Sequence, residues 1–391
     1  MKKIVDDDNC FLCKVCSNIC PKCSISFEMN NSLFEYPVID SEKCINCNLC
    51  SKKCISLNNS VEFRKPRQSY IVQAISDKVL NKSSSGGAFA VISKKILENG
   101  GIVFGATVDN SFNVYHTYID DVNDLYKLQG SKYVQSDVLN SYLKVKKFLC
   151  SGKTVLFSGL PCQVFGLYSF LGKDYDNLIT IDLVCHGTLS NAFLKDYINY
   201  YEKRNDCKVV DFLFRNKKFG WGKNGSIFIK KNGKIKEKLC NIYNSSYYYF
   251  FSKGFFYKNT CYSCPFAQYD RVSDITVGDF WGINDYKFKN KYKSKNGVSL
   301  VLVNSHKGER TFSDSNNNFT FEAVSKEMAI KDNGQLMHPC KFDNSCKKIF
   351  NDYVNSKDYA IIEKEFRRRN KYTIKKYFNF KVIHYLKKAI K

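Results

Sequence analysis

Two runs of cysteine near the start of the chain have a spacing suited to iron–sulfur clusters. The first run is Cys10, Cys13, Cys16 and Cys20, followed by Pro21. The second run is Cys44, Cys47, Cys50 and Cys54, with Ile55 in place of the proline. Both reproduce the C-x2-C-x2-C-x3-C pattern of bacterial ferredoxins, in which the fourth cysteine of each run ligates the other cluster. The spacing therefore predicts two 4Fe–4S clusters and a role in electron transfer.

The crossed pattern assigns four thiolates to each cluster. One cluster is expected on Cys10, Cys13, Cys16 and Cys54. The other is expected on Cys44, Cys47, Cys50 and Cys20. A structural zinc site is the alternative, but zinc sites usually take cysteines in pairs separated by a longer spacer. Cys23 lies outside the pattern and is expected to be an unligated thiol.

The residues between the two runs can form only a small support for the clusters. Apolar side chains at Phe34, Tyr36, Val38 and Ile39 favour a short hairpin within residues 27–39. Few other apolar residues are present, so this ferredoxin-like head, residues 1–62, should depend on its metal for folding.

Helical and strand patterns alternate after the basic residues 64–67. A helix is expected after Gly87, closed by Gly100, and another over residues 137–150. Strands are expected at 102–108, 154–157 and 178–184, with a turn at 158–161 followed by a helix. This order predicts an α/β body with a mixed sheet behind the head. We divide the body at residues 68–150 and 151–345, with a basic helical tail at 346–391.

A serine- and glycine-rich turn, Ser83 to Gly87, comes directly before the first helix of the body. Unpaired N–H groups at a helix N-terminus can bind a phosphate. The same residues also make an ordinary cap and loop, and the turn has neither the Walker nor the G-x-G-x-x-G pattern.

Four further cysteines lie at the ends of elements, and their loops can meet at one place. They are Cys162, Cys185, Cys261 and Cys264. A third four-cysteine site is one interpretation; buried small residues are the other, since free cysteine is commonly buried.

Several blocks of the body resemble one known family, the coenzyme F420 hydrogenase/dehydrogenase beta subunits. The blocks are 85–88 (SGGA), 130–136 (GSKYVQS), 158–163 (SGLPCQ), 185–187 (CHG), 261–265 (CYSCP), 271–282 (RVSDITVGDFWG) and 297–300 (GVSL). Members of that family are flavoproteins with iron–sulfur clusters, and some exchange hydride with a deazaflavin coenzyme. The resemblance therefore implies a flavin, either FAD or FMN, and a third 4Fe–4S cluster on the four body cysteines.

The resemblance also implies which residues contact the flavin. They are Ser85, Gly86, Gly87, Ala88, Lys132, Tyr133, Gln135, Ser136 and Gly159. His186 is the candidate for acid/base chemistry, with a structural histidine beside a cluster cysteine as the alternative. The turn Asp279 to Gly282 can line a substrate pocket or form a packed aromatic corner.

The charge of the chain is +24, and residues 366–391 hold ten basic and no acidic side chains. This favours an acidic protein, a membrane surface or an anionic cofactor, but no motif for nucleic acid accompanies it. Apolar residues recur every fourth position over 374–390, which predicts a basic amphipathic helix that packs on the body or contacts a membrane peripherally. The start of the chain has no signal-peptide pattern, so we expect a cytoplasmic protein, with membrane association through the tail as an option.

Two functions fit these features. The first is an iron–sulfur flavoprotein oxidoreductase that receives electrons from ferredoxin or another redox protein and reduces an unidentified small-molecule acceptor. The second is a non-enzymatic electron-transfer subunit of a larger redox complex.

Overall fold

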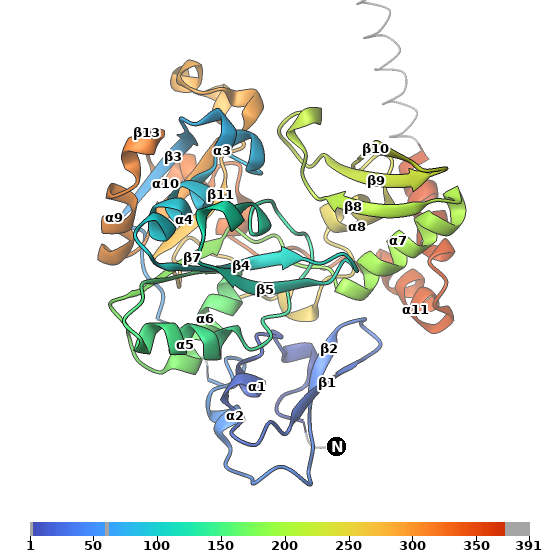
Figure 1. Cartoon of the computed structure of the whole chain (residues 1–391). Helices are drawn as coiled ribbons and strands as arrows, with labels where there is room; N and C mark the ends of the chain where they lie inside the picture. Colours follow the sequence, from blue (N-terminus) through green and yellow to red (C-terminus); the bar gives the residue numbers. More distant parts are fainter. Residues whose placement is uncertain (1–2, 59–61, 372–391) are drawn as a thin grey trace, which may run out of the picture.

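The centre of the molecule is an eight-stranded sheet with strand order β13-β3-β12-β11-β7-β6-β4-β5 (Figure 1). The computed structural model describes residues 3–58 and 62–371. The strands are β3 (Gln68–Ala74), β4 (Ile102–Val108), β5 (Val114–Ile119), β6 (Val155–Gly159), β7 (Leu178–Leu183), β11 (Ile275–Asp279), β12 (Ser299–Val303) and β13 (Phe319–Val324). Strands β11, β7, β6 and β4 run parallel, and the outer neighbours pair antiparallel. The α/β body with a mixed sheet is therefore confirmed.

Apolar residues of the central strands face two separate cores, because successive side chains of a strand point to opposite faces. In β4, Val103 faces a core built with α4 (Ala88–Glu98), whereas Ile102 and Phe104 face a core built with α5 (Ser141–Cys150) and α6 (Pro161–Leu171). Helix α4 thus covers one face of the sheet, and α5 and α6 cover the other (Figure 1). Shorter helices near the sheet are α3 (Asp77–Lys82), α9 (His306–Ser313) and α10 (Lys326–Ile330).

Three element boundaries differ from the sequence prediction. Helix α5 begins at Ser141, because Asp137 is hydrogen-bonded to the backbone of β5 through Val114 and His116. Strand β6 runs on to Gly159, because Ser158 and Gly159 pair with β7. The turn predicted at 158–161 is therefore shorter, and Pro161 is the first residue of α6, a position that proline favours. Strand β7 ends at Leu183.

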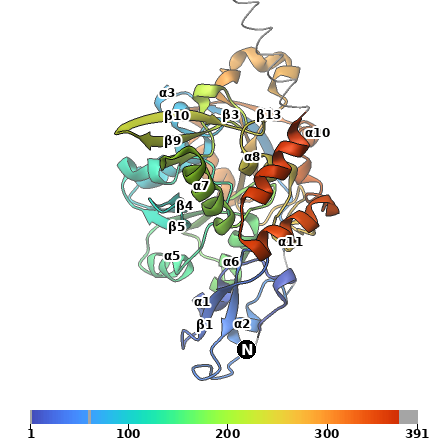
Figure 2. The ribbon, with the colours of Figure 1, turned by 90° about the vertical axis from the view of Figure 1, so that its right-hand side faces the viewer.

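The N-terminal residues form a small layer beneath the sheet (Figures 1 and 2). It contains α1 (Val15–Ile19), β1 (Ile25–Met29), β2 (Glu35–Ile39) and α2 (Leu49–Lys52). The hairpin predicted within residues 27–39 is present as β1 and β2, which pair antiparallel. The layer's own buried cluster consists of Cys10, Leu12, Phe34 and Tyr36.

The N-terminal layer packs against α6 through a close approach at Gly166. A Cβ added there would lie 3.1 Å from both the Cβ of Cys13 and a methyl carbon of Val15. Cys13, Val15 and Ile55 accordingly belong to the same buried core as α5 and α6. The cysteine-bearing residues are thus attached directly to the sheet domain.

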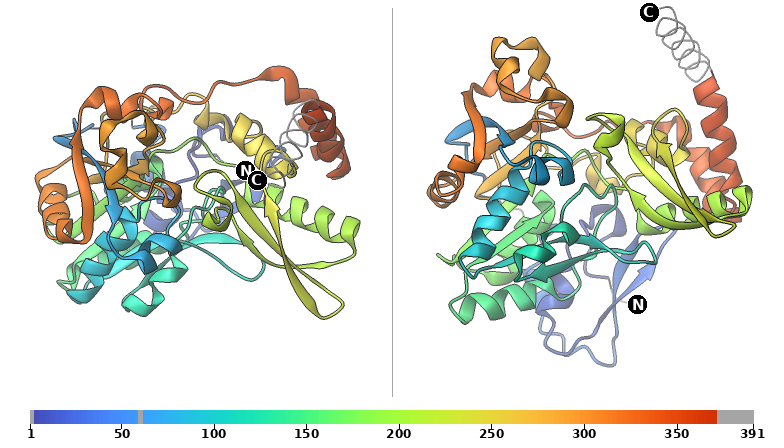
Figure 3. Two further views of the ribbon diagram at one scale, coloured as in Figure 1. Left: turned by 90° about the horizontal axis from the view of Figure 1, so that it is seen from above. Right: turned by 45° about the horizontal axis from the view of Figure 1, so that its top comes forward.

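A second lobe lies beside the sheet and has an aromatic core (Figure 3). Its elements are α7 (Asn191–Asn205), β8 (Lys208–Leu213), β9 (Gly225–Lys231), β10 (Lys234–Cys240), α8 (Ser246–Lys253) and α11 (Lys347–Ser356). A further helical stretch at 360–371 buries Ile362 and Phe366 in the same core. The amphipathic pattern predicted at 374–390 lies outside the described residues. Within residues 3–58 and 62–371, no helix is long and apolar enough to cross a bilayer.

Candidate functional site

The first predicted cysteine set surrounds a small hollow in the N-terminal layer. The hollow is lined by Cys10, Cys13, Cys16 and Cys54. Burial is the main cause that raises the pKa of Cys10 to about 11 and that of Cys16 to about 12. The neighbouring thiols raise these pKa values further, Cys54 acting on both. The fold therefore brings the fourth cysteine of the second run to the first three of the first run.

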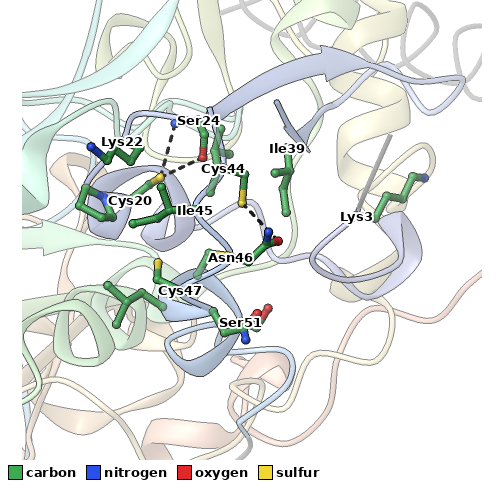
Figure 4. Close-up of a pocket in the computed structure, with 15 residues that line it drawn as sticks. Lys3, Cys20, Lys22, Ser24, Ile39, Cys44, Ile45, Asn46, Cys47 and Ser51 are labelled. Atoms are coloured by element: carbon green, nitrogen blue, oxygen red, sulfur yellow. Dashed lines mark hydrogen bonds between the residues drawn. The ribbon is translucent and has the colours of Figure 1, made fainter. Parts of the chain in front are cut away.

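The complementary set surrounds a second hollow, shown in Figure 4. It is lined by Cys20, Cys44, Cys47 and Cys50. The backbone N–H of Ser24 donates to Cys20 Sγ at 3.4 Å, and the Ser24 hydroxyl lies 3.2 Å from the same sulfur. Cys50 also raises the pKa of Cys16, so the two sets are neighbours. Cys23 is exposed and lines neither hollow.

A single metal ion and a 4Fe–4S cluster require different arrangements of their ligands. In the described part of the chain, no three His, Cys, Asp or Glu side chains are arranged to hold one metal ion. A zinc site needs four ligands converging on one point, whereas in a 4Fe–4S cluster each thiolate binds a different iron. All 18 cysteines are free of disulfide bonds.

The four body cysteines also come together, from three separate loops. Cys162 is in the first turn of α6, Cys185 follows β7, and Cys261 and Cys264 lie at the end of η4 (Asn259–Cys261) and just after it. Burial is the main cause that raises the pKa of Cys264 to about 12, and Cys162 and Cys261 add to it. The pKa of Cys185 is raised by burial and by the other three thiols. Each of the four therefore interacts with others of the group.

A buried arginine ties together the loops that carry these cysteines. The Arg271 guanidinium donates to the backbone oxygens of Phe266 and Gln268, just after Cys264, and to that of Leu183, just before Cys185. It also lies 3.2 Å from the carboxylate of Asp182, and both side chains are buried. The motif residues around 271 therefore act by positioning the cysteine loops.

A large cavity of about 330 Å³ opens at the carboxyl ends of the parallel strands. Its walls include Ala106 of β4, Gly159 of β6, Leu183 of β7 and Asp279 of β11. Ligands of α/β sheets bind at this edge because the loops that follow the strands converge there. Cys185 lies on its wall, so this central pocket is contiguous with the body cysteine group.

One end of the central pocket is the N-terminus of α4. Ser85, Gly87 and Ala88 line it, and Gly87 is the N-cap with φ of +88°, a conformation that favours glycine. Gly86 is not a wall residue. A Cβ there would lie 2.2 Å from the carbonyl oxygen of Val72, so this glycine permits close packing on the sheet.

The side chains of residues 132–136 point in two directions. Lys132, Tyr133 and Ser136 line the central pocket. Burial lowers the pKa of Lys132 to about 7, and its ammonium donates to the backbone oxygens of residues 128 and 129. Gln135 turns away, because its amide nitrogen donates to the carbonyl oxygens of Phe11 and Leu12 in the N-terminal layer. Seven of the nine predicted flavin contacts therefore share one cavity, and Gln135 joins the two layers instead.

Several wall residues were not anticipated from the sequence. Arg215 donates to Asp279 at 2.7 Å and packs 5.4 Å from the Trp281 ring, and its Nη2 is buried with no partner in the described structure. Lys223 lines the same wall, and burial lowers its pKa. His116 donates from Nε2 to the carbonyl oxygen of Ser158 at 3.0 Å, and its Nδ1 lies 3.0 Å from the Ser136 hydroxyl. These are isolated residues in the sequence, so only their convergence reveals them.

The residues of the Asp279 to Gly282 turn divide between the central pocket and the core. Asp279 and Trp281 line the pocket, while Phe280 is buried in a hydrophobic cluster. The Trp221 indole donates to Asp279 at 2.8 Å and stacks on Trp281 with a 5.0 Å centroid distance. The carboxylate therefore fixes the arginine and the tryptophan pair at one end of the pocket.

His186 also lines the central pocket, beside Cys185. Its Nδ1 lies 2.8 Å from the hydroxyl of Tyr257, which itself donates to the carbonyl oxygen of Phe251. Because the tyrosine proton is used in that bond, Nδ1–H is the donor to the tyrosine oxygen and Nε2 is an acceptor. Burial lowers the pKa of His186 to about 4, so the imidazole is neutral at pH 7.

The chain is similar to proteins that act in coenzyme F420 chemistry. Residues 152–328 match the family described as the C terminus of the coenzyme F420 hydrogenase/dehydrogenase beta subunit. A curated relative, F420-dependent formate dehydrogenase 1 subunit beta of Methanococcus maripaludis, is 23% identical over 318 residues, covering 78% of this chain and 73% of the relative. In a solved structure of the F420-reducing NiFe hydrogenase complex from Methanosarcina barkeri, one chain matches with a TM-score of 0.44 and 17% identity, covering 77% of this chain and 93% of that one.

The family match and the curated relative agree with the sequence blocks that suggested the same family. The matched residues, 152–328, contain all four body cysteines and the buried arginine at position 271. The predicted resemblance is confirmed over residues 152–328, which match the C-terminal part of the coenzyme F420 hydrogenase/dehydrogenase beta-subunit family.

Proposed function

We propose that this protein is an iron–sulfur flavoprotein oxidoreductase. Electrons enter from a ferredoxin-type donor, pass through 4Fe–4S clusters held by the three cysteine groups, and reach a flavin, FAD or FMN, in the central pocket. The observation that carries the proposal is the position of Cys185, which belongs to the body cysteine group and also forms part of the pocket wall. A cluster there would adjoin whatever the pocket binds.

The pocket wall fits an anionic, planar cofactor. A flavin, when bound, exchanges electrons in pairs with a substrate and singly with clusters. Gly87 and Ala88 present the N-terminus of an 11-residue helix, where backbone N–H groups and the helix dipole favour a phosphate. Lys132, Lys223 and the unpaired Nη2 of Arg215 add donors to the same cavity. Tyr133 stacks on Phe251 at 4.3 Å, which gives one wall a rigid apolar surface.

The neutral His186 has a limited role in this proposal. The hydrogen bond from Nδ1 to Tyr257 holds the ring, and Nε2 is then able to accept a proton or a hydrogen bond from a ligand. The adjacent Cys185 makes a purely structural role equally compatible with the geometry.

Anaerobic purification followed by iron, sulfide and flavin analysis tests the proposal. Three clusters require about 12 iron atoms per chain and two require about 8. We expect Cys185→Ser to lose about four iron atoms, because each cubane contains that number. The matched control is Cys23→Ser, an exposed thiol outside all three groups, which should retain the full content. Full iron without any flavin would overturn the flavoprotein assignment.

A second candidate is an electron-transfer subunit that acts only within a complex. The name of the curated relative, a formate dehydrogenase subunit beta, favours this alternative and suggests redox partner subunits. Turnover by the isolated chain, with reduced ferredoxin and an artificial acceptor, separates the two. Activity of the isolated chain supports the enzyme, and activity that requires an added subunit supports the relay.

The proposed location is the cytoplasm, with peripheral membrane contact through the tail as the option to be tested. A deletion from residue 372 onward is compared with the full chain for binding to anionic vesicles. Equal binding by both proteins would reject a membrane role for the tail.

A further inference from the structure

Lys258 is one of the largest fully buried side chains of the protein, with 2% of its surface exposed. It precedes η4, three residues before Cys261. Its ammonium donates to the carbonyl oxygen of Phe11 at 2.6 Å and to Oε1 of Gln135 at 2.8 Å. The side chain therefore crosses from the body into the N-terminal layer.

Among residues 3–58 and 62–371, no carboxylate pairs with the ammonium of Lys258. In the described residues, the four groups that act most strongly on its charge are Cys261, Cys162, Cys10 and Tyr36. The backbone N–H of Cys261 also donates to the carbonyl oxygen of Lys258 at 2.8 Å. A buried ammonium is costly unless negative charge compensates it, and cysteines that ligate a cluster would supply that charge as thiolates.

Those thiols belong to two different cysteine groups. Cys10 is in the first group of the N-terminal layer, and Cys162 and Cys261 are in the body group. The second group of the N-terminal layer, which contains Cys20 and Cys44, contributes none of the four strongest interactions. Lys258 is thus placed between two of the three groups.

We propose that Lys258 is the shared counter-charge of these two clusters and the residue that tunes electron passage between them. The inference rests on the proposed function, because it requires clusters in both groups. Reduction of a cluster adds one electron from the ferredoxin-type donor, with no bond formed or broken, and makes the cluster more negative by one charge. A fixed positive charge stabilises that reduced state in both clusters at once.

The position of Lys258 also has a geometric consequence. Its bond to the Phe11 carbonyl oxygen is adjacent to Cys10, and Gln135, its other acceptor, itself donates to Phe11 and Leu12. This network fixes the cysteine-bearing loop against the body. Lys258 is therefore a positioning residue as well as an electrostatic one.

The test is a redox titration of the full-length, iron-loaded protein, monitored by electron paramagnetic resonance with dithionite as reductant. In Lys258→Met, the reduced-to-oxidised ratio at a fixed potential should fall at least about tenfold for two clusters, which is a midpoint lowered by about 59 mV. The third cluster should not shift, which provides an internal control. Lys258→Arg keeps the charge and should keep both midpoints.

A matched control is Lys307→Met, which removes a lysine that donates to the Tyr175 carbonyl oxygen and lines neither cysteine hollow nor the central pocket. It should leave all midpoints unchanged. If Lys258→Met does not load iron, Lys258→Gln replaces it. Iron loading by Lys258→Arg but by neither neutral variant also supports the counter-charge, since only arginine keeps the positive charge.

Loaded Lys258→Met or Lys258→Gln with unchanged midpoints would overturn the inference while leaving the proposed function intact. A wild-type protein without iron would overturn the proposed function itself, and the inference with it. A uniform shift of all three midpoints would also overturn the inference, because it would indicate a general change of structure.

Discussion

Replacing Arg271 by methionine should destabilise the protein by about 3–5 kcal/mol, the usual cost of leaving a buried charge without its partner. The Arg271 and Asp182 side chains are 2% and 0% exposed, so water cannot replace the guanidinium. After the change, the Asp182 carboxylate still accepts a hydrogen bond from the hydroxyl of Thr276, at 2.6 Å. Three backbone oxygens also lose their donor, each loss being worth about 1 kcal/mol, so the cost should lie at or above the upper end of that range.

Urea unfolding measures this change, and the two tryptophans provide the signal. Trp221 and Trp281 are the only tryptophans of the chain and stack on each other beside the central pocket. The matched control is Arg67→Met, which removes an exposed ion pair with Glu309, 3.2 Å apart, and should cost at most about 1 kcal/mol.

Iron analysis gives a second readout of the same variant. Because Arg271 ties the loop after Cys264 to the strand before Cys185, its loss should release about four iron atoms per chain. The iron of the N-terminal layer should stay.

The reasoning is refuted if Arg271→Met is no less stable than Arg67→Met and keeps all of its iron. The double variant Asp182→Leu with Arg271→Met separates the causes. Substantial recovery of stability is expected, since an apolar pair of similar volume often replaces a buried ion pair without loss. Without recovery, the lost backbone bonds rather than the unpaired carboxylate would be responsible.

Three further perturbations test other parts of the structure. Gln163→Ala should cost about 2–3 kcal/mol in urea unfolding and weaken flavin retention, because the buried amide donates to Ser136 and accepts from the N–H of Leu160; retention of both would contradict this. Burial lowers the pKa of Lys132 from its ordinary 10.5 to about 7, so between these values only the unfolded state is protonated and stability should rise with pH. In Lys132→Met, the urea midpoint should increase less with pH than it does in the wild-type protein. An unchanged pH profile would argue against a lowered pKa of Lys132. Iron removal by a chelator should make residues 3–58 sensitive to protease before the body, because their own buried cluster has only four members; simultaneous cleavage would count against a metal-dependent head.

The cysteine groups show how much the local spacing of residues can predict. Each C-x2-C-x2-C run predicts three thiolates of one site by itself, because neighbouring turns of backbone bring them together. The fourth thiolate comes from the other run, and the fold does bring Cys54 to Cys10 and Cys20 to Cys44. The alternation of helices and strands likewise predicted the mixed sheet, since hydrophobic periodicity is a local property.

Other features depended on side-chain direction and long-range packing. Gln135 belongs to a block that resembles flavin contacts, yet its amide points to Phe11 in the N-terminal layer, whereas Tyr133 and Ser136 line the pocket. Arg215, from the second lobe, reaches the pocket across 64 residues of sequence to meet Asp279. No local pattern marks such a pair.

Lys258 illustrates the same limit most clearly. In the sequence, Lys258 is one of many lysines and lies three residues before a C-x2-C pair. Its burial between two cysteine groups arises only when the N-terminal layer packs on the body. Residue types and spacing therefore predicted three thiols of each N-terminal group, because that part of the pattern is local. Which groups face the pocket, and which charge lies between the cysteine groups, was decided by tertiary packing, because it depends on segments far apart in the chain.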